Sequence, residues 1–335
     1  MSKTVTIALD AMGGDHGVSV AVPAALWMLR KHSALEILLV GQRDAIDEVL
    51  DGDTHERLHI HEASQVVGMD EPPADALRKK KDSSMRVAVN LVKEGVADAC
   101  VSAGNTGALM ATGRFVLKTL PGIDRPAIMA IVPTMTGRTY MLDLGANSEC
   151  TAEHLFQFAV MGAVVVGGLE DIDHDPTVAL LNIGEEDIKG NDTIREAARM
   201  LSETSLNYVG FIEGNSIADH KADVVVCDGF SGNIALKSME GTAKLVAHFL
   251  EREFRSSPYG WFAGLVALPL LRSLRKRLDP RRYNGASLVG LKGIVVKSHG
   301  GADALAMAQA IKVATLEVEK RVPDQIRELL ERQVH

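Results

Sequence analysis

The chain has 335 residues, of which 46% are hydrophobic and 24% charged, and its formal net charge is −8. This composition is typical of a globular protein with one large domain or two small ones. The negative charge argues against general nucleic-acid binding. Three scattered cysteines fit reduced thiols in a cytoplasmic protein better than a disulfide framework. We identify no signal peptide and no uninterrupted apolar stretch of about 18 residues, the length that a membrane span needs.

The hydrophobic pattern predicts strands and helices that alternate along the chain. Strands are expected at 5–9, 35–40, 58–61, 97–101, 128–132, 140–144, 178–183, 208–212, 224–227 and 289–296. Helices are expected at 18–31, 44–50, 85–92, 106–117, 152–166, 233–254 and 302–320, and residues 62–83 form a polar crossover. This order indicates an α/β protein with a largely parallel sheet covered on both faces. Ligands of such sheets bind beyond the carboxyl ends of the strands.

The stretch 97–113, ADACVSAGNTGALMATG, is central to this interpretation. A strand that passes through Gly-Asn-Thr-Gly into a helix leaves free N–H groups at a helix N-terminus, where they favour an anion. Gly104 and Gly107 allow the backbone to approach a ligand closely. Taken alone, this motif is better explained as a tight structural turn.

The other strand exits share this composition. They read DAMGGDHG (10–17), DLGANSE (143–149), IGEEDIKGND (183–192), EGNS (213–216), CDGFSGN (227–233) and KSHGGAD (297–303). Glycine alone in these loops would be explained by its role in tight turns. Its repeated pairing with amides, lysine or histidine indicates one polar cleft rich in donors, whose expected guest is an anion such as phosphate.

Several common chemistries lack their motifs. The sequence contains no GxxxxGK[ST] and no GxGxxG, and Gly-Phe-Ser-Gly at 229–232 is not a GxSxG elbow. No metal and no cofactor is predicted. The carboxylates Asp10, Asp15, Asp143, Glu185 and Glu186 could hold a metal ion, but for most of them we expect a role in capping helices and binding loop N–H groups. Cys150 has no evident adjacent base and is expected to be a small buried thiol.

The ordered motifs DAMGGD, SAGNTGALMA, DLGAN, IGEEDIKGND, DGFSGN and VVKSHGGAD together resemble the bacterial phosphate acyltransferase family, from residue 4 to about residue 322. The resemblance implies a three-layer α/β/α sandwich of the phosphotransacetylase and isocitrate-dehydrogenase-like type, and a homodimer. It implies that inorganic phosphate takes the acyl group of acyl-[acyl carrier protein], giving acyl phosphate for phospholipid synthesis. A downstream membrane acyltransferase is a further expected partner. Val18 departs from the family pattern, in which we expect a proline.

Phosphate is already an anionic nucleophile, so this reaction depends on positioning, worth about 7–11 kcal/mol at best, and on stabilising the oxyanion. Lys189 is assigned to phosphate and to developing negative charge, with a solvated loop lysine as the alternative. Asn105 and Asn233 are assigned to phosphate or oxyanion contacts, with helix capping as the alternative. His299 is expected to orient phosphate or to protonate the leaving thiolate. Further substrate-binding candidates in the same loops are Asp10, Gly13, Gly14, Asp15, Gly104, Thr106, Asn147, Glu185, Ser231 and Gly232.

The chain is expected to form a single catalytic domain, 1–335, with a protruding amphipathic helical tip at about 251–284. The run 259–271, YGWFAGLVALPLL, is too short to span a bilayer, and Pro269 can begin a helix. From there four leucines fall on one face, with basic residues opposite or beside them. This predicts contact with an anionic membrane surface and a peripheral, cytoplasmic location; packing in the dimer interface or an acyl groove is the alternative. The expected tip residues are Trp261, Phe262, Leu270, Leu271, Leu274 and Leu278.

Docking of an acidic carrier protein requires a local basic surface, because the chain itself is acidic. Two basic segments qualify, residues 272–282 and residues 78–81. Two other functions remain open. One is a nicotinamide-dependent dehydrogenase of related fold, against which the chain lacks an Arg-rich loop with paired aspartates. The other is a non-catalytic membrane or carrier-protein scaffold, which would not need donor-lined loops.

Overall fold

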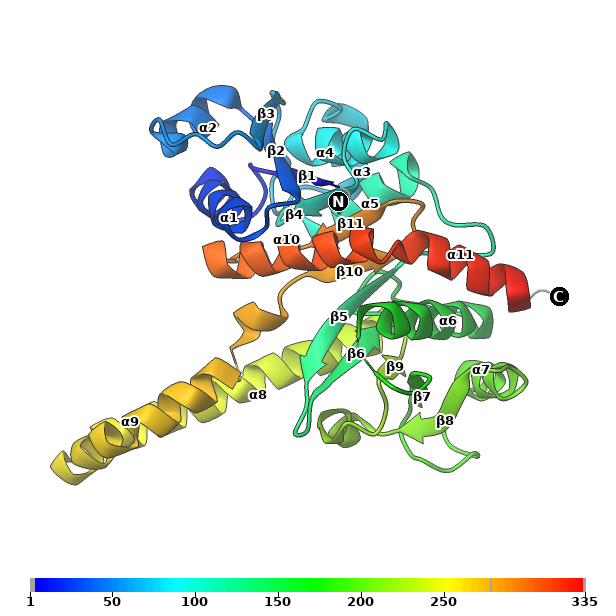
Figure 1. Ribbon diagram of the computed structural model, residues 1–335. Helices are drawn as coiled ribbons and strands as arrows, with labels where there is room; N and C mark the ends of the chain where they lie inside the picture. Colours follow the sequence, from blue (N-terminus) through cyan, green and yellow to red (C-terminus); the bar gives the residue numbers. More distant parts are fainter. Residues whose placement is uncertain (1–3, 171, 278, 334–335) are drawn as a thin grey trace.

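The computed structural model describes residues 4–170, 172–277 and 279–333 (Figure 1). Within them, one sheet of eleven strands has the order β3-β2-β1-β4-β11-β10-β5-β6-β9-β7-β8. The strands are β1 Val5–Asp10, β2 Leu35–Gly41, β3 Leu58–Glu62, β4 Ala99–Ser102, β5 Ala127–Pro133, β6 Arg138–Leu142, β7 Thr177–Leu181, β8 Asn207–Ile212, β9 Val224–Val226, β10 Ala286–Val289 and β11 Ile294–Lys297. The helices are α1 Val18–Lys31, α2 Arg43–Leu50, α3 Pro73–Lys79, α4 Ser84–Lys93, α5 Thr106–Val116, α6 Ala152–Leu169, α7 Asp192–Ser202, α8 Gly229–Arg255, α9 Pro258–Arg277, α10 Ala304–Glu319 and α11 Val322–Gln333, with short 3₁₀ turns at Gly214–Asp219 and Pro280–Tyr283.

The sheet consists of two parallel halves that run in opposite directions. Strands β3, β2, β1, β4 and β11 are mutually parallel, and so are β6, β9, β7 and β8. Strands β10 and β5 lie between the halves and are antiparallel to their neighbours. The stretch 289–296 holds a strand as expected, β11, but that strand is shorter, and residue 289 belongs to β10. Gly290, at φ 91°, begins a turn that splits this apolar run into the hairpin of β10 and β11.

The register nevertheless brings the carboxyl ends of both halves to one level of the sheet. In the first half Leu9, Val101 and Val296 pair side by side near the ends of their strands. In the second half Leu142 pairs with Val226 in the same way. The pairings through β10 and β5 connect the two rows. The loops that carry the glycine and amide motifs thus follow one line across the sheet, although they leave it in opposite directions.

Most of the expected elements are present with small shifts of their ends, but three helices were not expected. Helix α3 lies within the stretch assigned as crossover, and α7 and α11 were not identified. Helix α7 begins after Asn191, whose side chain accepts the N–H of Ile194. The charged face of α7 obscured its apolar positions, of which Ala197 and Leu201 are buried.

Helix α6 corrects the expectation that the chain has no apolar stretch long enough to span a membrane. Its 18 residues, with a mean hydropathy of 1.4, are long and apolar enough to cross a membrane by length and composition alone. In the fold 56% of this helix is buried, and Phe158, which is fully buried, belongs to a core cluster with residues from β6, β7 and β9. Helix α6 is therefore a core helix.

Helices α8 and α9 form an arm that projects from the sheet domain (Figure 1). The start of α8 packs against β5 and β6, and its distal part packs against α9. Within the described residues of α8, only Gly229 and Gly232 are buried. Pro269 lies inside α9 and does not begin a helix, so this expectation is wrong. Leu278 lies outside the described residues, as do the side chains of 275–277.

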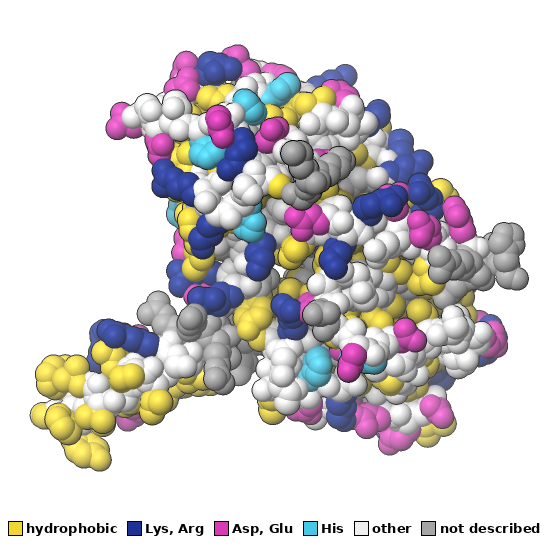
Figure 2. Space-filling model, in the orientation of Figure 1, with side chains coloured by type: hydrophobic (Ala, Val, Ile, Leu, Met, Phe, Trp, Pro, Cys, Tyr) yellow, Lys and Arg dark blue, Asp and Glu magenta, His cyan; other side chains and the backbone are white. Residues whose placement is uncertain are grey.

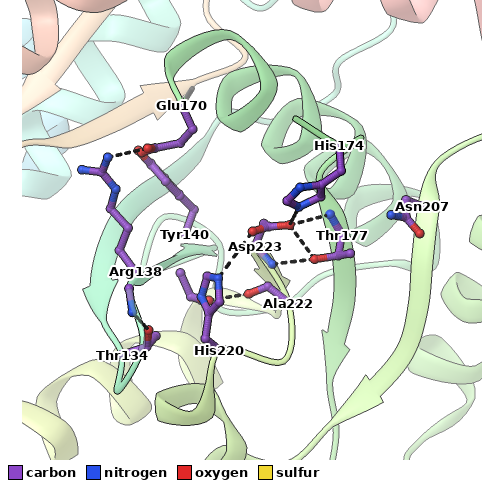
Figure 3. A network of polar contacts seen from close by, with 12 residues as sticks. Thr134, Arg138, Tyr140, Glu170, His174, Thr177, Asn207, His220, Ala222 and Asp223 are labelled. Atoms are coloured by element: carbon purple, nitrogen blue, oxygen red, sulfur yellow. Dashed lines mark hydrogen bonds and ion pairs between the residues drawn. The ribbon is translucent and has the colours of Figure 1, made fainter. Parts of the chain in front are cut away.

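A polar network fixes the amino ends of β7 and β9, away from the motif loops (Figure 3). The carboxylate of Asp223 accepts hydrogen bonds from the N–H and hydroxyl of Thr177, at 2.8 and 2.6 Å. The ring of His174 lies between two carboxylates, 3.3 Å from Asp173 and 3.2 Å from Asp223. These contacts raise the pKa of His174, and the Thr177 and His174 contacts outweigh burial to lower the pKa of Asp223. Beside them the Tyr140 hydroxyl and Arg138 both bond to Glu170 (Figure 3).

The His174 contact predicts a pH-dependent part of the stability. Because the pKa of His174 is higher in the folded than in the unfolded protein, its stabilisation is complete below the unfolded value of 6.5. It is lost as pH rises through the folded value. We expect the difference in melting temperature between wild type and His174→Gln to be largest near pH 5.5 and to shrink at higher pH. His59→Gln, which changes an exposed histidine on β3, is the control. A difference that does not vary with pH would contradict this assignment.

Candidate functional site

The loops that follow β1 and β4 are interlocked around Asp10. This carboxylate is buried and accepts hydrogen bonds from the Ser102 hydroxyl, at 2.6 Å, and from the N–H of Met12, at 3.2 Å. Burial raises its pKa, and these hydrogen bonds partly oppose the shift. A Cβ on Gly13 would lie 2.5 Å from Oδ2 of Asp10 and 2.8 Å from the backbone N of Gly104. Glycine is therefore required at Gly13 because the two loops touch there.

The loop that follows β11 joins this cluster and contributes Lys297. The N–H of Asp15 donates to the carbonyl of Gly300 at 2.9 Å, and Gly14, at φ 87°, lies against the same carbonyl. Lys297 is only 8% exposed, and its ammonium donates to the carbonyl of Ala103 at 3.1 Å and to that of Ser298. Desolvation lowers the pKa of Lys297 to about 8, although the charges of Asp10 and Asp15 act in the opposite direction. A buried cation with so low a pKa is typical of a functional site.

His299 lies beside this lysine in a defined orientation. Its Nδ1 accepts the N–H of Gly301 at 3.1 Å, which places the proton of the neutral ring on Nε2. Partial desolvation lowers the pKa of His299, and the charges of Lys237 and Lys297 lower it further. Lys237 belongs to α8, so the first turns of the arm bring a positive charge from the second half of the sheet toward the first.

The second half has its own buried hub at Asp143, directly after β6. Its carboxylate accepts the N–H groups of Ile128, Ala146 and Asn147 at 2.9, 3.0 and 2.7 Å. It also accepts Nδ2 of Asn147 at 2.9 Å, and that amide also donates to the carbonyl of Pro126. Burial raises the pKa of Asp143. The side chain of Asn147, a substrate-binding candidate, is therefore engaged in holding this loop.

Helix α8 starts against the Asp143 hub. Asp228 caps the helix by accepting the N–H of Ser231 at 2.8 Å, and the Ser231 hydroxyl donates to the same carboxylate at 2.8 Å. A Cβ on Gly232 would lie 2.0 Å from the carbonyl oxygen of Asp143. Asn233 is exposed in the first turn, and its side chain adjoins Gly145 of the DLGAN loop. Asn233 is thus free of the capping role, which Asp228 performs.

The remaining predicted residues are more dispersed. Asn105 caps α5 by accepting the N–H of Ala108 at 3.0 Å, and its amide donates to the carbonyls of Met69 and Glu71 at 2.8 and 3.0 Å. Asn105 therefore has the helix-capping role that was the alternative interpretation, and both of its amide hydrogens are donated to backbone carbonyls. Its contact with phosphate stays a prediction. Thr106, the next residue, is exposed.

Lys189 and Glu185 lie in a third loop, which follows β7. Lys189 is exposed, and its carbonyl accepts Nδ2 of Asn182 at 3.3 Å. Glu185 forms an ion pair with Lys221.

The structure thus brings the predicted residues together in two groups. The group near His299, in the first half of the sheet, comprises Asp10, Gly13, Gly14, Asp15 and Gly104. The group around Asp143, in the second half, comprises Asn147, Ser231, Gly232 and Asn233. Within the described residues no group of three or more His, Cys, Asp or Glu side chains could hold a metal ion.

Comparison with known proteins identifies the family. Residues 5–325 match the model of a family described as "Fatty acid synthesis protein". The chain is 61% identical to a phosphate acyltransferase of Alkalilimnicola ehrlichii, covering 99% of this chain and 97% of the relative. It is 60% identical to a phosphate acyltransferase of Methylococcus capsulatus, covering 96% of each. The chain belongs to the phosphate acyltransferase family. It is an acyltransferase, which confirms the resemblance of the six motifs.

Solved structures confirm the fold of this phosphate acyltransferase family member. A phosphotransacetylase from Streptococcus pyogenes superimposes with a TM-score of 0.62 at 19% identity, over 94% of each chain. A phosphotransacetylase from Staphylococcus aureus gives a TM-score of 0.61 at 15% identity, over 95% of each. The expected phosphotransacetylase-like α/β/α sandwich is therefore correct, with a sheet that is only mostly parallel.

Two lysines of this site, Lys297 and Lys237, were missed by the sequence analysis. Lys297 opens the motif KSHGGAD, but it was regarded as part of an exit loop, although it is the last residue of β11. The available signal was its position directly after the buried run IVV, because lysine is rarely buried without a specific role. Lys237 carries no local signal, because its proximity to His299 depends on the path of α8 between the two halves.

The cysteines do not supply an activated thiolate. Burial raises the pKa of Cys100 and of Cys227. Desolvation and the charges of Asp143 and Asp228 raise the pKa of Cys150 to about 11. A nucleophilic cysteine needs a lowered pKa, so the acyltransferase has no prepared cysteine nucleophile among these three.

The burial of Lys297 predicts opposite effects on activity and stability. Lys297→Met removes a desolvated charge, so we expect a melting temperature at pH 7 equal to or above that of wild type. We expect at least a tenfold loss in kcat/KM for phosphate, because the anion loses its buried cation. In wild type the KM for phosphate should rise as pH increases through about 8, where Lys297 loses its proton. Lys292→Met, at an exposed lysine in the preceding turn, is the control. Normal activity in Lys297→Met would contradict a role in the site.

Proposed function

We propose that this protein transfers a long-chain acyl group from acyl-[acyl carrier protein] to inorganic phosphate, giving acyl phosphate for phospholipid synthesis. The names of its relatives support acyl transfer to phosphate. The observation that carries the proposal for this chain is the buried ammonium of Lys297, next to His299 and among glycine-rich loops at the strand ends. Such a cluster suits a small anion, since it combines a poorly hydrated cation with backbone that a ligand can approach.

The proposed reaction needs no covalent enzyme intermediate. A phosphate oxygen forms a bond to the thioester carbon, the carbon–sulfur bond breaks, and the thiolate leaves with the electron pair. Lys297 and Lys237 hold the negative charge of phosphate close to this carbon, and positioning of this kind supplies much of the rate enhancement. The Nε2–H of His299 donates a hydrogen bond to phosphate or to the developing oxyanion. Lys189 and Asn233 are proposed to contact phosphate or the oxyanion from the second half.

The experiment follows phosphate-dependent release of carrier thiol from long-chain acyl-carrier protein, with the acyl phosphate trapped by hydroxylamine. We expect Lys189→Ala and Asn233→Ala each to lose at least tenfold in activity while remaining folded and dimeric. Lys189→Arg should also be poor, because a planar guanidinium does not replace a compact ammonium. Lys244→Ala, at an exposed lysine farther along α8, is the control. Absence of thiol release by wild type would contradict the proposed function. Normal turnover in both alanine variants would contradict only the two assignments.

We also propose that the arm serves a homodimer and a membrane. On α8, Leu245, Val246, Phe249 and Leu250 are exposed, a continuous apolar stretch that a second copy of the arm would cover. At the end of the arm hydrophobic side chains gather, with basic side chains along one side (Figure 2). Trp261 and Phe262 are each 63% exposed and Leu270 is 76% exposed, whereas Leu271 is half-buried. An aromatic and aliphatic tip beside basic residues suits the interface of an anionic membrane.

This arrangement fits the proposed product and partners. Acyl phosphate made at the surface of a membrane would be close to a membrane acyltransferase that consumes it. A carrier protein is proposed to dock on basic residues at 272–282 or 78–81, and the side chains of Arg275, Lys276 and Arg277 lie outside the described residues. The catalytic domain would then be cytoplasmic and peripherally associated with the membrane.

Flotation with vesicles that contain anionic lipid tests the tip. Wild type should float, and Leu270→Glu/Leu274→Glu should remain in the dense fraction as a dimer, because charge at these exposed positions opposes insertion. Leu245→Glu/Phe249→Glu should instead yield monomers, which size-exclusion chromatography with light scattering detects. Wild type that does not float would contradict membrane contact. A monomeric tip variant would assign these leucines to the dimer.

A further inference from the structure

Asn284 directly follows the 3₁₀ turn Pro280–Tyr283, which connects α9 to β10 at the root of the arm (Figure 1). Both amide hydrogens and the amide oxygen of this side chain have protein partners. Nδ2 donates to the hydroxyl of Ser298 at 2.8 Å and to the carbonyl of Ala306 at 2.7 Å, and Oδ1 accepts the N–H of His299 at 3.0 Å. A flipped amide would place its NH₂ group against the N–H of His299, so these contacts define the orientation of the side chain.

The peptide group between Ser298 and His299 is held from both sides. Its N–H donates to Oδ1 of Asn284, and its carbonyl, which belongs to Ser298, accepts the ammonium of Lys297. Strand β11 ends at Lys297, so this peptide lies beyond the end of the strand. In a trans peptide the N–H and the C=O point in opposite directions within one plane. The orientation in which Asn284 accepts the N–H is therefore also the one that turns the carbonyl toward Lys297.

Neighbouring contacts fix Asn284 against the start of α10. Arg281, three residues earlier, forms an ion pair with Asp303 at 2.9 Å, and Asp303 is the N-cap of α10. Gly285, the next residue, has a φ of 113°, and a Cβ there would lie 3.0 Å from the Cα of Ala310. The segment is thus packed closely on a helix of the core, so the amide of Asn284 is held in place before any ligand binds.

Lys297 depends on its carbonyl acceptors because it is buried. One acceptor is the carbonyl just described, and the other is that of Ala103 at 3.1 Å. The charges that act on the ammonium come from Asp10 on β1, Asp15 in the loop that follows, and Lys237 on α8. The two carboxylates favour the ammonium, but burial outweighs them and lowers the pKa of Lys297 to about 8. Loss of one acceptor would lower this pKa further, because a hydrogen bond to the charged form favours that form.

We propose that Asn284 is a positioning residue for phosphate: by holding the peptide between Ser298 and His299 in one orientation, it keeps the ammonium of Lys297 in the place where it meets the anion. This inference rests on the proposed function, in which Lys297 and His299 contact phosphate. Both amide hydrogens of Asn284 already have protein acceptors, so Asn284 acts through the loop and not by contact with the anion. The same contact fixes the backbone from which the ring of His299 projects.

The experiment measures the Kd of inorganic phosphate by calorimetry, and its KM in thiol release, as functions of pH. Asn284→Ala removes the acceptor of the peptide N–H and frees the carbonyl to turn away from Lys297. We expect the pH above which phosphate binding weakens to fall by about one pH unit, the effect of losing one hydrogen bond to a charged group. At pH 8 the charged fraction of Lys297 then falls from about one half to about one tenth, so Kd and KM should both rise about fivefold. The ionisation of phosphate itself is the same in every sample and does not affect the comparison between proteins.

A second variant, Asn284→Asp, separates positioning from stability. It keeps an oxygen for the N–H of His299 but turns its other oxygen toward the carbonyl of Ala306, so the melting temperature should fall. Its negative charge favours the lysine ammonium, so phosphate binding should persist to the same pH as in wild type or to a higher one. The control is Asn207→Ala on β8, which removes another amide that donates to a backbone carbonyl, that of Asp175 at 3.0 Å. It should leave the pH dependence of wild type unchanged.

The results separate this inference from the proposed function. A downward shift in Asn284→Ala without one in Asn284→Asp supports the inference. Asn284→Leu, which keeps the volume of the side chain, should shift as Asn284→Ala does, so the result does not depend on the folding of one variant. An unshifted profile in the alanine and leucine variants would overturn the inference, as would equal downward shifts in all three variants, and thiol release by wild type would then still support the proposed function. If wild type binds phosphate but releases no thiol, the proposed function fails, and the Kd profiles alone decide the role of Asn284.

Discussion

The structure depends on the hydrogen bonds to the buried carboxylate of Asp143. Four donors from β5, the DLGAN loop and Asn147 converge on it. A buried carboxylate is costly unless it is fully hydrogen-bonded, so this set of donors fixes the loop in one conformation. Gly229 and Gly232 then allow α8 to start in direct contact with the hub. The direction of α8, and with it the position of Lys237 and of the whole arm, follows from this contact.

Helix α8 connects the two halves of the sheet, in addition to strands β10 and β5. A fully parallel sheet would carry all of its exit loops on one edge, whereas here the halves run in opposite directions and meet at one level. Helix α8 overcomes this separation, because it begins at the Asp143 hub and carries Lys237 toward His299. The site clusters of the two halves can therefore act on one ligand only if α8 keeps its path, which explains why close-packed glycines occupy its first turn.

The sequence was sufficient for the alternating elements, the exit-loop motifs and the family, because glycine and amide patterns are local features. It was insufficient for Lys297 and Lys237, whose importance depends on burial and on contact between distant segments. The hairpin of β10 and β11 was hidden in an apolar run with no polar break except Lys292. The motifs that contain Asn105 and Asn147 were identified, but in the structure their side-chain amides donate hydrogen bonds to backbone carbonyls of neighbouring loops. Amides in a motif of this kind often build the site and need not touch its ligand.

The electrostatics of the first half suggest how phosphate affinity is linked to pH. Lys297 is held among Asp10, Asp15 and Lys237 with its pKa lowered to about 8, so at pH 7 it is mostly protonated at a cost in desolvation. A phosphate anion placed beside it stabilises the ammonium and raises its pKa. If phosphate binds beside Lys297 as we propose, its binding near and above pH 8 is accompanied by proton uptake.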